Sequence, residues 1–191
     1  MRLLMLDNEF PPLGGGMGTV NQALLNCYAN TTDLEIDLIT SSLGGHEEVE
    51  QFADHIRIIK LPVWNRNMHH STCRELLLYT TQALLRAVKY HRLRAYDYCL
   101  AWSTVPAGAI ALVLHRVFLL PYSVWVSGPD IPGFERRYRY IYPLLSPLIR
   151  SVWRHATPVI ATCAGEIELL KAVDDSIEVT FIPNGVDLRV L

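Results

Sequence analysis

The chain has 191 residues, a formal net charge of −2 and 50% hydrophobic residues, which is typical of a globular protein with one sizeable core. Because the charges nearly balance, the sequence argues against a general nucleic-acid surface, which would need a strong basic excess. We therefore expect one domain over residues 1–191 and no nucleic-acid partner.

The chain opens with a predicted strand, a glycine loop and a predicted helix. Apolar residues at 3–6 indicate the strand, and Gly14, Gly15 and Gly16 form the loop. Glycines at the mouth of a helix let backbone N–H groups approach an anion, where the helix dipole also favours negative charge. The loop therefore suggests a phosphate or diphosphate site, and the alternative is an ordinary strand-to-helix turn. The helix is predicted to pack through Val20, Ala23, Leu24, Cys27 and Tyr28.

The glycine loop does not fit the dinucleotide-binding fingerprint. That pattern needs a third small residue, but the two possible registers place Thr19 or Asn21 there. The second predicted strand also ends without the acidic residue that would hold a ribose. We therefore expect neither a nicotinamide nor a flavin, and no other cofactor.

Strand-like runs and helical patterns alternate along the chain. Several runs are apolar on both faces, which is typical of a mostly parallel sheet. The pattern predicts a three-layer, doubly wound, Rossmann-like α/β fold with a seven-stranded sheet. Its predicted strands are residues 2–6, 35–40, 56–61, 96–102, 122–127, 158–162 and 179–182, and its predicted helices are about 18–30, 72–92, 105–117, 135–155 and 165–173. In the second helix, the stripe expected to cover the sheet is Leu76, Ala83, Leu84, Ala87, Val88 and His91.

Two connecting segments are predicted to be loops. Residues 42–55 are polar and acidic, which favours a surface loop with a short helix. Residues 62–72 contain Trp64 and the adjacent pair His69 and His70, which could ligate a metal. Because no third ligand stands at a useful spacing, a solvated loop is the preferred interpretation and we expect no metal.

The four cysteines, Cys27, Cys73, Cys99 and Cys163, are far apart in the sequence. Their spacing suggests reduced, mostly buried thiols in an intracellular protein. Residues 102–126 are apolar enough to raise the possibility of a transmembrane helix. Pro106, Gly108 and Pro121 divide that span, which favours a buried helix followed by a buried strand.

Ligands of open parallel sheets bind at the carboxyl ends of the strands. The loops predicted there include Trp102, the run Ser127-Gly128-Pro129-Asp130, and the run Asn184-Gly185-Val186-Asp187. Carboxylate and amide groups suit the recognition of sugar-like hydroxyl groups. The alternative is that Asp130 and Asp187 cap turns.

Three motifs together resemble the N-terminal half of the family 4 (group 1) retaining glycosyltransferases. They are Pro11-Pro12-Leu13-Gly14-Gly15-Gly16-Met17-Gly18, Gly128-Pro129-Asp130-Ile131-Pro132-Gly133 and Ile182-Pro183-Asn184-Gly185-Val186-Asp187. The resemblance implies a GT-B fold, in which an N-terminal acceptor domain faces a C-terminal donor domain across a cleft. No Glu-x7-Glu motif of the donor domain stands in the proper context, so we expect that domain to be absent from this chain.

The resemblance also implies roles for individual residues. Gly15 and Gly16 would lie near the diphosphate of a UDP-, GDP- or ADP-sugar donor. The acceptor side would hold Trp102, Ser127, Gly128 and Asp130, with Asp130 positioning the acceptor, and the domain junction would hold Asn184, Gly185 and Asp187. Ser127 replaces a histidine of many members, so no imidazole role is carried over. The absence of an Asp-x-Asp triplet implies no metal.

The implied function is the transfer of a sugar, with retention, to a sugar, lipid-linked or small-molecule acceptor by a cytoplasmic enzyme. One alternative is a module that binds an acceptor or a partner chain without activity of its own. Another is half of a GT-B sugar-nucleotide 2-epimerase. Residues 135–155 are basic and aromatic, which suggests peripheral contact with the inner face of a membrane. Because Pro143 and Pro147 interrupt the helical periodicity, a plain pair of surface helices is the alternative.

Overall fold

The computed structural model describes residues 1–31, 33–64, 67–68, 71–136 and 139–185. Within these residues one eight-stranded sheet forms the centre, in the order β3-β4-β2-β1-β5-β6-β7-β8. Every neighbouring pair is parallel except β3 and β4. The strands are β1 (Arg2–Leu6), β2 (Glu35–Ser42), β3 (Glu48–Ala53), β4 (Ile56–Pro62), β5 (Tyr98–Ala101), β6 (Tyr122–Trp125), β7 (Val159–Ala161) and β8 (Val179–Phe181).

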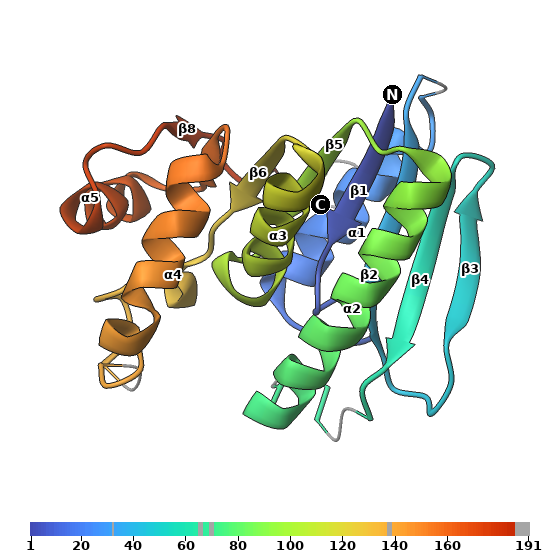
Figure 1. The fold of residues 1–191 in the computed structure, drawn as a ribbon, viewed down its shortest axis with the longest axis horizontal. Coiled ribbons are helices and arrows are strands. Elements are labelled where there is room, and N and C mark those ends of the chain that lie inside the picture. The colour runs from blue at the N-terminus through green and yellow to red at the C-terminus, as the bar shows by residue number, and fades with distance from the viewer. Residues whose placement is uncertain (32, 65–66, 69–70, 137–138, 186–191) are drawn as a thin grey trace.

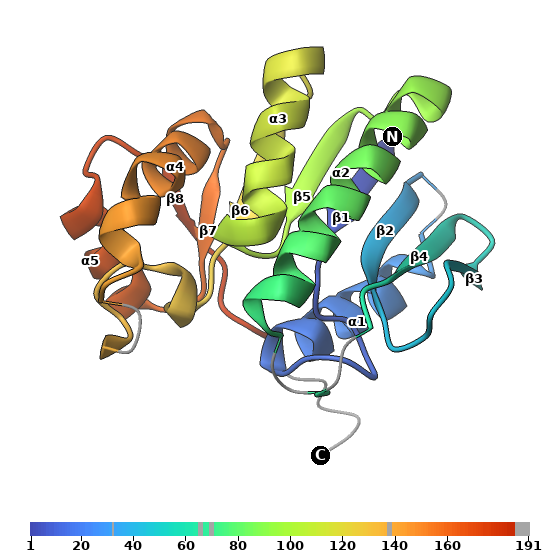
Figure 2. The ribbon, with the colours of Figure 1, turned by 60° about the horizontal axis from the view of Figure 1, so that its bottom comes forward.

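Helices cover both faces of the sheet, as the doubly wound prediction requires. Figures 1 and 2 show α1 on one face and the other long helices on the opposite face. Right-handed crossovers explain this division, because the chain moves from β1 to β2 in one direction and from β4 through β5 to β8 in the other. The helices are α1 (Gly16–Tyr28), α2 (Cys73–Arg94), α3 (Ala109–Phe118), α4 (Tyr142–His155) and α5 (Ala164–Val173), with short turns η1 (Thr104–Gly108) and η2 (Gly128–Asp130).

The eighth strand is a correction to the prediction of seven. Residues 48–53, expected in a loop with a short helix, form the antiparallel edge strand β3. All six of its residues are exposed or half-buried, so the strand lacks the apolar alternation by which strands are recognised. Backbone pairing with β4 and an ion pair between Lys60 and Glu50 at 2.6 Å hold it in place.

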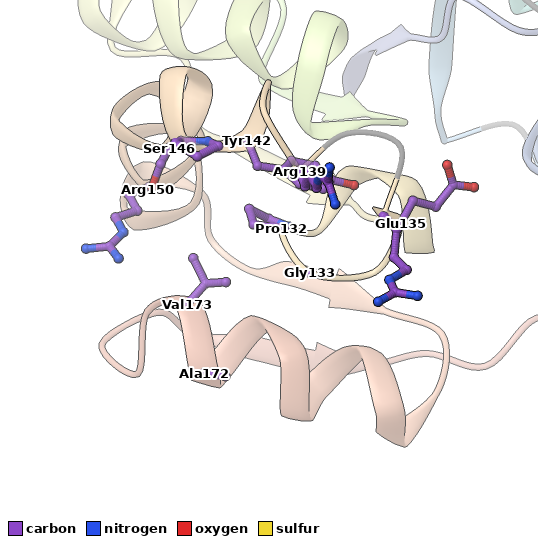
Figure 3. Close-up of a pocket in the computed structure, with 11 residues that line it drawn as sticks. Pro132, Gly133, Glu135, Arg139, Tyr142, Ser146, Arg150, Ala172 and Val173 are labelled. Carbon is purple, nitrogen blue, oxygen red and sulfur yellow. The ribbon is translucent and has the colours of Figure 1, made fainter.

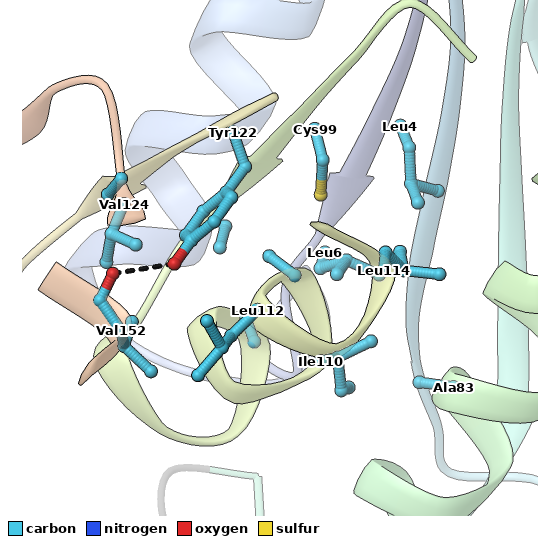
Figure 4. Close-up of a cluster of buried hydrophobic side chains, with 14 of the residues drawn as sticks. Leu4, Leu6, Ala83, Cys99, Ile110, Leu112, Leu114, Tyr122, Val124 and Val152 are labelled. Carbon is cyan, nitrogen blue, oxygen red and sulfur yellow. Dashed lines mark hydrogen bonds between the residues drawn. The ribbon is translucent and has the colours of Figure 1, made fainter. Parts of the chain in front are cut away.

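The larger hydrophobic core lies between the sheet and helices α2, α3, α4 and α5. Figure 4 shows part of it, including Leu4 and Leu6 of β1 and Ile110 and Leu114 of α3. The Tyr122 hydroxyl donates a hydrogen bond of 2.6 Å to a backbone carbonyl of α4. A smaller core on the other face packs beneath α1. The sheet is therefore held on both faces, which fixes the positions of the loops at its ends.

Two helices differ from their predicted forms. The buried residues of α1 are Gly18, Asn21 and Leu25. Of the predicted contact face, Val20, Leu24 and Tyr28 are half-buried and pack against the core, whereas Ala23 and Cys27 are exposed. Helix α4 begins at residue 142 rather than 135. By contrast, the stripe predicted for α2 is confirmed, with Ala83 and Ala87 fully buried.

The prediction of mostly buried cysteines is wrong. Cys99 is buried, whereas Cys27, Cys73 and Cys163 are exposed free thiols. Cys27 lies on the exposed side of α1, and the other two lie at the starts of helices. Residues 102–126 form η1, α3 and β6, and no helix within the described part of the chain is both long and apolar enough to cross a membrane.

Candidate functional site

A cavity of about 590 Å³ lies where β1, β5 and β6 end, at the carboxyl edge of the sheet. This is the edge at which parallel α/β sheets bind ligands. The starts of α2 and α4 reach the same edge (Figures 1 and 2) and supply its apolar wall through Leu76, Ile141, Leu145 and Ile149. The polar groups of the lining are Asp7, Asn8, Glu9, Ser71, Ser103, Thr104, Ser127 and Asp130.

Asp7 is a buried carboxyl group in this lining, directly after β1. Asp7 is only 2% exposed. The side-chain amide of Asn21 donates to Asp7 Oδ2 at 2.8 Å, and the Glu9 N–H donates to Oδ1 at 2.9 Å. Burial raises the pKa of Asp7 to about 7, despite these hydrogen bonds, and the nearby charges of Glu9 and Asp130 act in the same upward direction.

Asp130 lies across the cavity at the end of η2. Both the N–H and the hydroxyl of Ser127 donate to Asp130 Oδ2, at 3.1 and 3.2 Å, so the capping role considered from the sequence is present in the structure. Burial raises the pKa of Asp130 to about 7, while backbone hydrogen bonds from Ser127 and Thr104 oppose that rise. A carboxyl group with a pKa near neutrality can accept and return a proton at physiological pH.

Trp102 forms another part of the lining. Its indole stacks on that of Trp125, with ring centroids 4.7 Å apart and planes tilted by 14°. The Nε1 atoms of both rings are buried without a hydrogen-bond partner among the described residues. Beside them, Thr104 accepts a hydrogen bond of 3.0 Å from Trp153 Nε1, which ties the cavity to α4.

The glycine loop reaches the cavity through Met17. Gly15 and Gly16 are exposed at the start of α1, and a Cβ added at either would meet nothing within 4 Å. No described side chain caps this helix, so its first N–H groups are open to an anion. Gly14, by contrast, has a φ of +97°, and a side chain there would collide with Glu9.

The remaining predicted site residues are placed differently. Gly128 is buried against the ring of Phe134, where a Cβ would collide with it, so Gly128 supports the loop rather than lining the cavity. Asn184 and Gly185 are exposed after β8. Asp187 lies outside the described residues, as does the pair His69 and His70.

A second cavity, of about 650 Å³, lies between α4, the loop before it and the end of α5. Arginines dominate its polar lining, and Figure 3 shows Arg139 and Arg150 at opposite sides of it. The lining residues are Pro132, Gly133, Glu135, Arg136, Arg139, Tyr142, Pro143, Ser146, Arg150, Ala172 and Val173.

The family model of the glycosyl transferase 4-like domain matches residues 15–185. The chain belongs to this glycosyltransferase family. A search of the curated proteins found no match. The family assignment identifies the sheet as the N-terminal half of a GT-B fold and supports the transferase class.

Solved structures show the same fold. Sucrose-phosphate synthase from Thermosynechococcus elongatus is 16% identical, with a TM-score of 0.75 over 100% of this chain and 49% of that one. A UDP-forming trehalose-phosphate synthase from Burkholderia xenovorans, in complex with glucose-6-phosphate, is 12% identical, with a TM-score of 0.54 over 88% and 42%. UDP-GlcNAc 2-epimerase from Methanocaldococcus jannaschii is 10% identical, with a TM-score of 0.56 over 96% and 46%. The glycosyltransferase domain thus spans about half the length of these proteins.

Sequence reasoning selected Trp102, Ser127 and Asp130, which the structure brings together around one cavity. It did not select Asp7. The signal was available, because Asp7 directly follows the first strand and the rule that ligands bind at the carboxyl ends of strands applies to it as well. The Asp7 carboxyl group is buried beneath α1, whose Asn21 donates a hydrogen bond to it. The predicted contact face of α1 did not include Asn21.

Proposed function

We propose that this domain binds the acceptor of a retaining glycosyltransferase that uses a nucleotide-sugar donor. The observation that carries the proposal is the pair of carboxyl groups, the buried Asp7 and the half-buried Asp130, in a cavity at the carboxyl edge of a glycosyltransferase-family sheet. Their pKa values of about 7 mark carboxyl groups in an unusual environment, which suits groups that bind and orient an acceptor hydroxyl. Asp130 positions the acceptor, and Asp7 supports it from the opposite side.

The donor diphosphate is proposed to lie at the start of α1. The uncapped N–H groups after Gly15 and Gly16 would hold the leaving phosphate, and the open space at both glycines allows its close approach. Transfer would proceed on one face of an oxocarbenium-like sugar, with the leaving diphosphate helping to deprotonate the acceptor hydroxyl. The protein contributes orientation and charge stabilisation.

A C-terminal donor domain is part of the proposal. The solved structures similar to this chain are about twice its length, and the sequence resemblance assigns most of the donor contacts to the second half. We propose that cationic side chains of that domain complete the phosphate site, and that Asn184, Gly185 and Asp187 lie near the junction. The donor is a UDP-, GDP- or ADP-sugar, and one of the similar structures is itself UDP-forming.

A thermal-shift screen tests the division between the domains. UDP-, GDP- and ADP-glucose are added to this chain and to a longer chain that carries the residues encoded beyond Leu191. We expect the longer chain alone to be stabilised, and the nucleotide that stabilises it identifies the donor. Tight binding of a nucleotide sugar by the short chain would contradict the division.

Replacement of Gly16 tests the phosphate role. Gly16→Val should abolish turnover of the two-domain enzyme and leave its melting temperature nearly unchanged, because a Cβ at this position meets no neighbouring atom. Thr19→Val, on the next turn of the same helix, is the matched control. It should retain activity, because the Thr19 hydroxyl already donates to the Gly15 carbonyl at 3.2 Å and is therefore not expected to bind the phosphate. Unchanged turnover in Gly16→Val would contradict the phosphate role.

The two alternatives give different results in the same enzyme. A 2-epimerase converts its sugar nucleotide without an acceptor, whereas the proposed transferase needs one to release the nucleoside diphosphate efficiently. Product analysis with donor alone therefore separates them. A binding module would release no nucleotide in either case. We prefer the transferase because the matched family model is that of a glycosyl transferase domain.

The proposal includes a location at the inner face of a membrane. Among the acceptors that the sequence leaves open, the apolar wall of the cavity favours one that carries hydrocarbon, because Leu76, Leu145 and Ile149 face the same space as the two carboxyl groups. Such an acceptor is a lipid-linked sugar or a lipid. Contact through residues 135–155 would bring the domain to it.

A further inference from the structure

The start of α4 and the loop before it carry an unusual number of exposed apolar side chains. Leu144 is 81% exposed and Tyr140 is 77% exposed. Within α4, Leu144 and Leu148 lie at helical spacing from Ile141, so the three share one side of the helix. We define the α4 patch as the exposed apolar residues Phe134, Tyr140, Ile141, Leu144 and Leu148 together with the exposed arginines Arg136, Arg139 and Arg150.

The charge of this segment is opposite to that of the rest of the chain. Residues 134–155 contain five arginines and one glutamate, a net charge of +4, in a chain whose net charge is −2. The other residues therefore carry a net charge of −6. A partner of the α4 patch is accordingly anionic, and one that contacts the exposed leucines is also apolar.

The arginines of the α4 patch lie beside its aromatic and apolar side chains. Arg139 and Arg150 both line the 650 Å³ cavity (Figure 3). The guanidinium of Arg139 lies 4.5 Å from the centroid of the Tyr140 ring, so cation and aromatic ring are presented together. This combination is typical of segments that lie in the headgroup region of a bilayer.

We infer that the α4 patch docks on an anionic lipid bilayer. The apolar side chains of Leu144 and Leu148 enter the boundary between headgroups and acyl chains, and Arg136, Arg139 and Arg150 contact lipid phosphates. The cavity between α4 and α5 receives a headgroup.

The placement of the patch connects it to the candidate site. Ile141 is exposed on the patch and also lines the 590 Å³ cavity, and Leu145 lies beside it on the cavity wall. A bilayer docked on the patch would therefore lie next to the mouth of the cavity. Docking of the α4 patch specifies the membrane location that is part of the proposed function, and the entry of a lipid-borne acceptor along α4 rests on that function.

Vesicle co-sedimentation tests the inference on this chain. The protein is mixed with vesicles of phosphatidylcholine alone and with vesicles of phosphatidylcholine and phosphatidylglycerol. We expect sedimentation with the anionic vesicles, little with the neutral ones, and a decline as salt is added. Equal binding to both compositions, or binding to neither, would overturn the inference.

Matched variants locate the surface. Leu144→Gln with Leu148→Gln should weaken vesicle binding roughly tenfold or more, and Arg139→Gln with Arg150→Gln should weaken it to a similar extent at low salt. The controls are Leu85→Gln and Leu93→Gln on α2, which are 69% and 71% exposed but lie outside the patch. Equal losses in the controls would overturn the assignment to α4.

Size-exclusion chromatography of the same variants addresses a protein partner. Should the chain self-associate, and should Leu144→Gln abolish that association without changing vesicle binding, the patch is an interface between copies and the inference is wrong. Failure of the proposed function can be told apart from failure of this inference. Turnover of Gly16→Val, which is expected to be lost, is measured without vesicles, whereas docking is measured without a donor.

Discussion

Two buried aspartates lie toward opposite ends of the neighbouring strands β1 and β2. They have the same exposed fraction but different surroundings. Asp37, near the start of β2, and Asp7, just after β1, are both 2% exposed. Asp37 is enclosed by cations, whereas Asp7 has an amide and a backbone N–H as its partners. The chain thus surrounds one buried aspartate with cations, and leaves the other, at the carboxyl edge of the sheet, with neutral partners only.

The environment of Asp37 is a complete ion-pair network. Arg57 donates two hydrogen bonds of 2.8 Å to its carboxylate, and Tyr96 donates one of 2.5 Å. Arg94 lies 3.4 Å from the same carboxylate and also pairs with Glu35. The hydrogen bond to Asp37 raises the pKa of Arg57 above its ordinary value. In such a network each partner compensates the buried charge of the others, so that removal of one partner alone is costly.

Asp7 and Asp130 form the contrasting pair. Within the described residues neither forms an ion pair with Lys or Arg, and burial is the largest cause of the raised pKa of each. Desolvation of this kind destabilises the charged form and therefore costs folding free energy. That cost is expected of a site kept for binding or proton transfer.

The largest expected effect comes from breaking the compensated site. Arg57→Met should destabilise the protein by about 3 kcal/mol, because it leaves a buried carboxylate with weaker partners. Urea unfolding at neutral pH measures the loss. Adding Asp37→Leu to Arg57→Met should recover part of it, and a double variant that is much less stable than the single one would contradict this account of Asp37.

The second expected effect is a gain in stability rather than a loss. Asp7→Asn should stabilise the protein at pH 8 by a few kcal/mol, because the neutral amide avoids the cost of a buried charge. The unpartnered Oδ1 of Asn21 can accept a hydrogen bond from the new amide after a flip of the Asn21 side chain. Thermal and urea unfolding at several pH values measure the difference.

The pH dependence of that difference follows from the pKa. In the folded protein Asp7 keeps its proton up to a pKa of about 7, whereas the unfolded chain loses it near the ordinary value of 3.8. Stability of the natural protein therefore falls as pH rises between these values. The Asp7→Asn variant should lack this part of the fall, and the two proteins should differ least below pH 3.8.

The smallest effect comes from an ion pair between the exposed Arg154 and the buried Asp174. Arg154 donates to Asp174 Oδ2 at 2.6 Å, and hydrogen bonds from Ser176, followed by that from Arg154, lower the pKa of Asp174 to about 2. Because this folded pKa is lowered, the stabilisation is present above the ordinary value of 3.8 and is lost as pH falls through about 2. Arg154→Gln should cost about 1 kcal/mol or less at pH 7, measured by urea unfolding. A larger loss would show that solvent screens this ion pair less than the 54% exposure of the Arg154 side chain indicates.

The sequence predicted most of the parallel strands and the loops at their carboxyl ends, because apolar runs and turn residues carry those features locally. It missed β3, whose residues show no contrast between buried and exposed faces. It also missed the buried Asn21 and Gly18 of α1, because these residues are not apolar signals. The site inherited that error, since Asn21 is the partner that marks Asp7 as buried.

Carboxyl-detected NMR of the chain labelled with ¹³C-aspartate tests the central claim most directly, because it measures the ionisation of Asp7 and Asp130 themselves. We predict two carboxyl resonances with midpoints near pH 7, one lost in Asp7→Asn and the other in Asp130→Asn. The midpoint of the Asp7 resonance should fall in Asp130→Asn, because the charge of Asp130 raises the pKa of Asp7. Titration of every aspartate near its ordinary value would contradict the claim that this edge of the sheet holds an uncompensated acidic site.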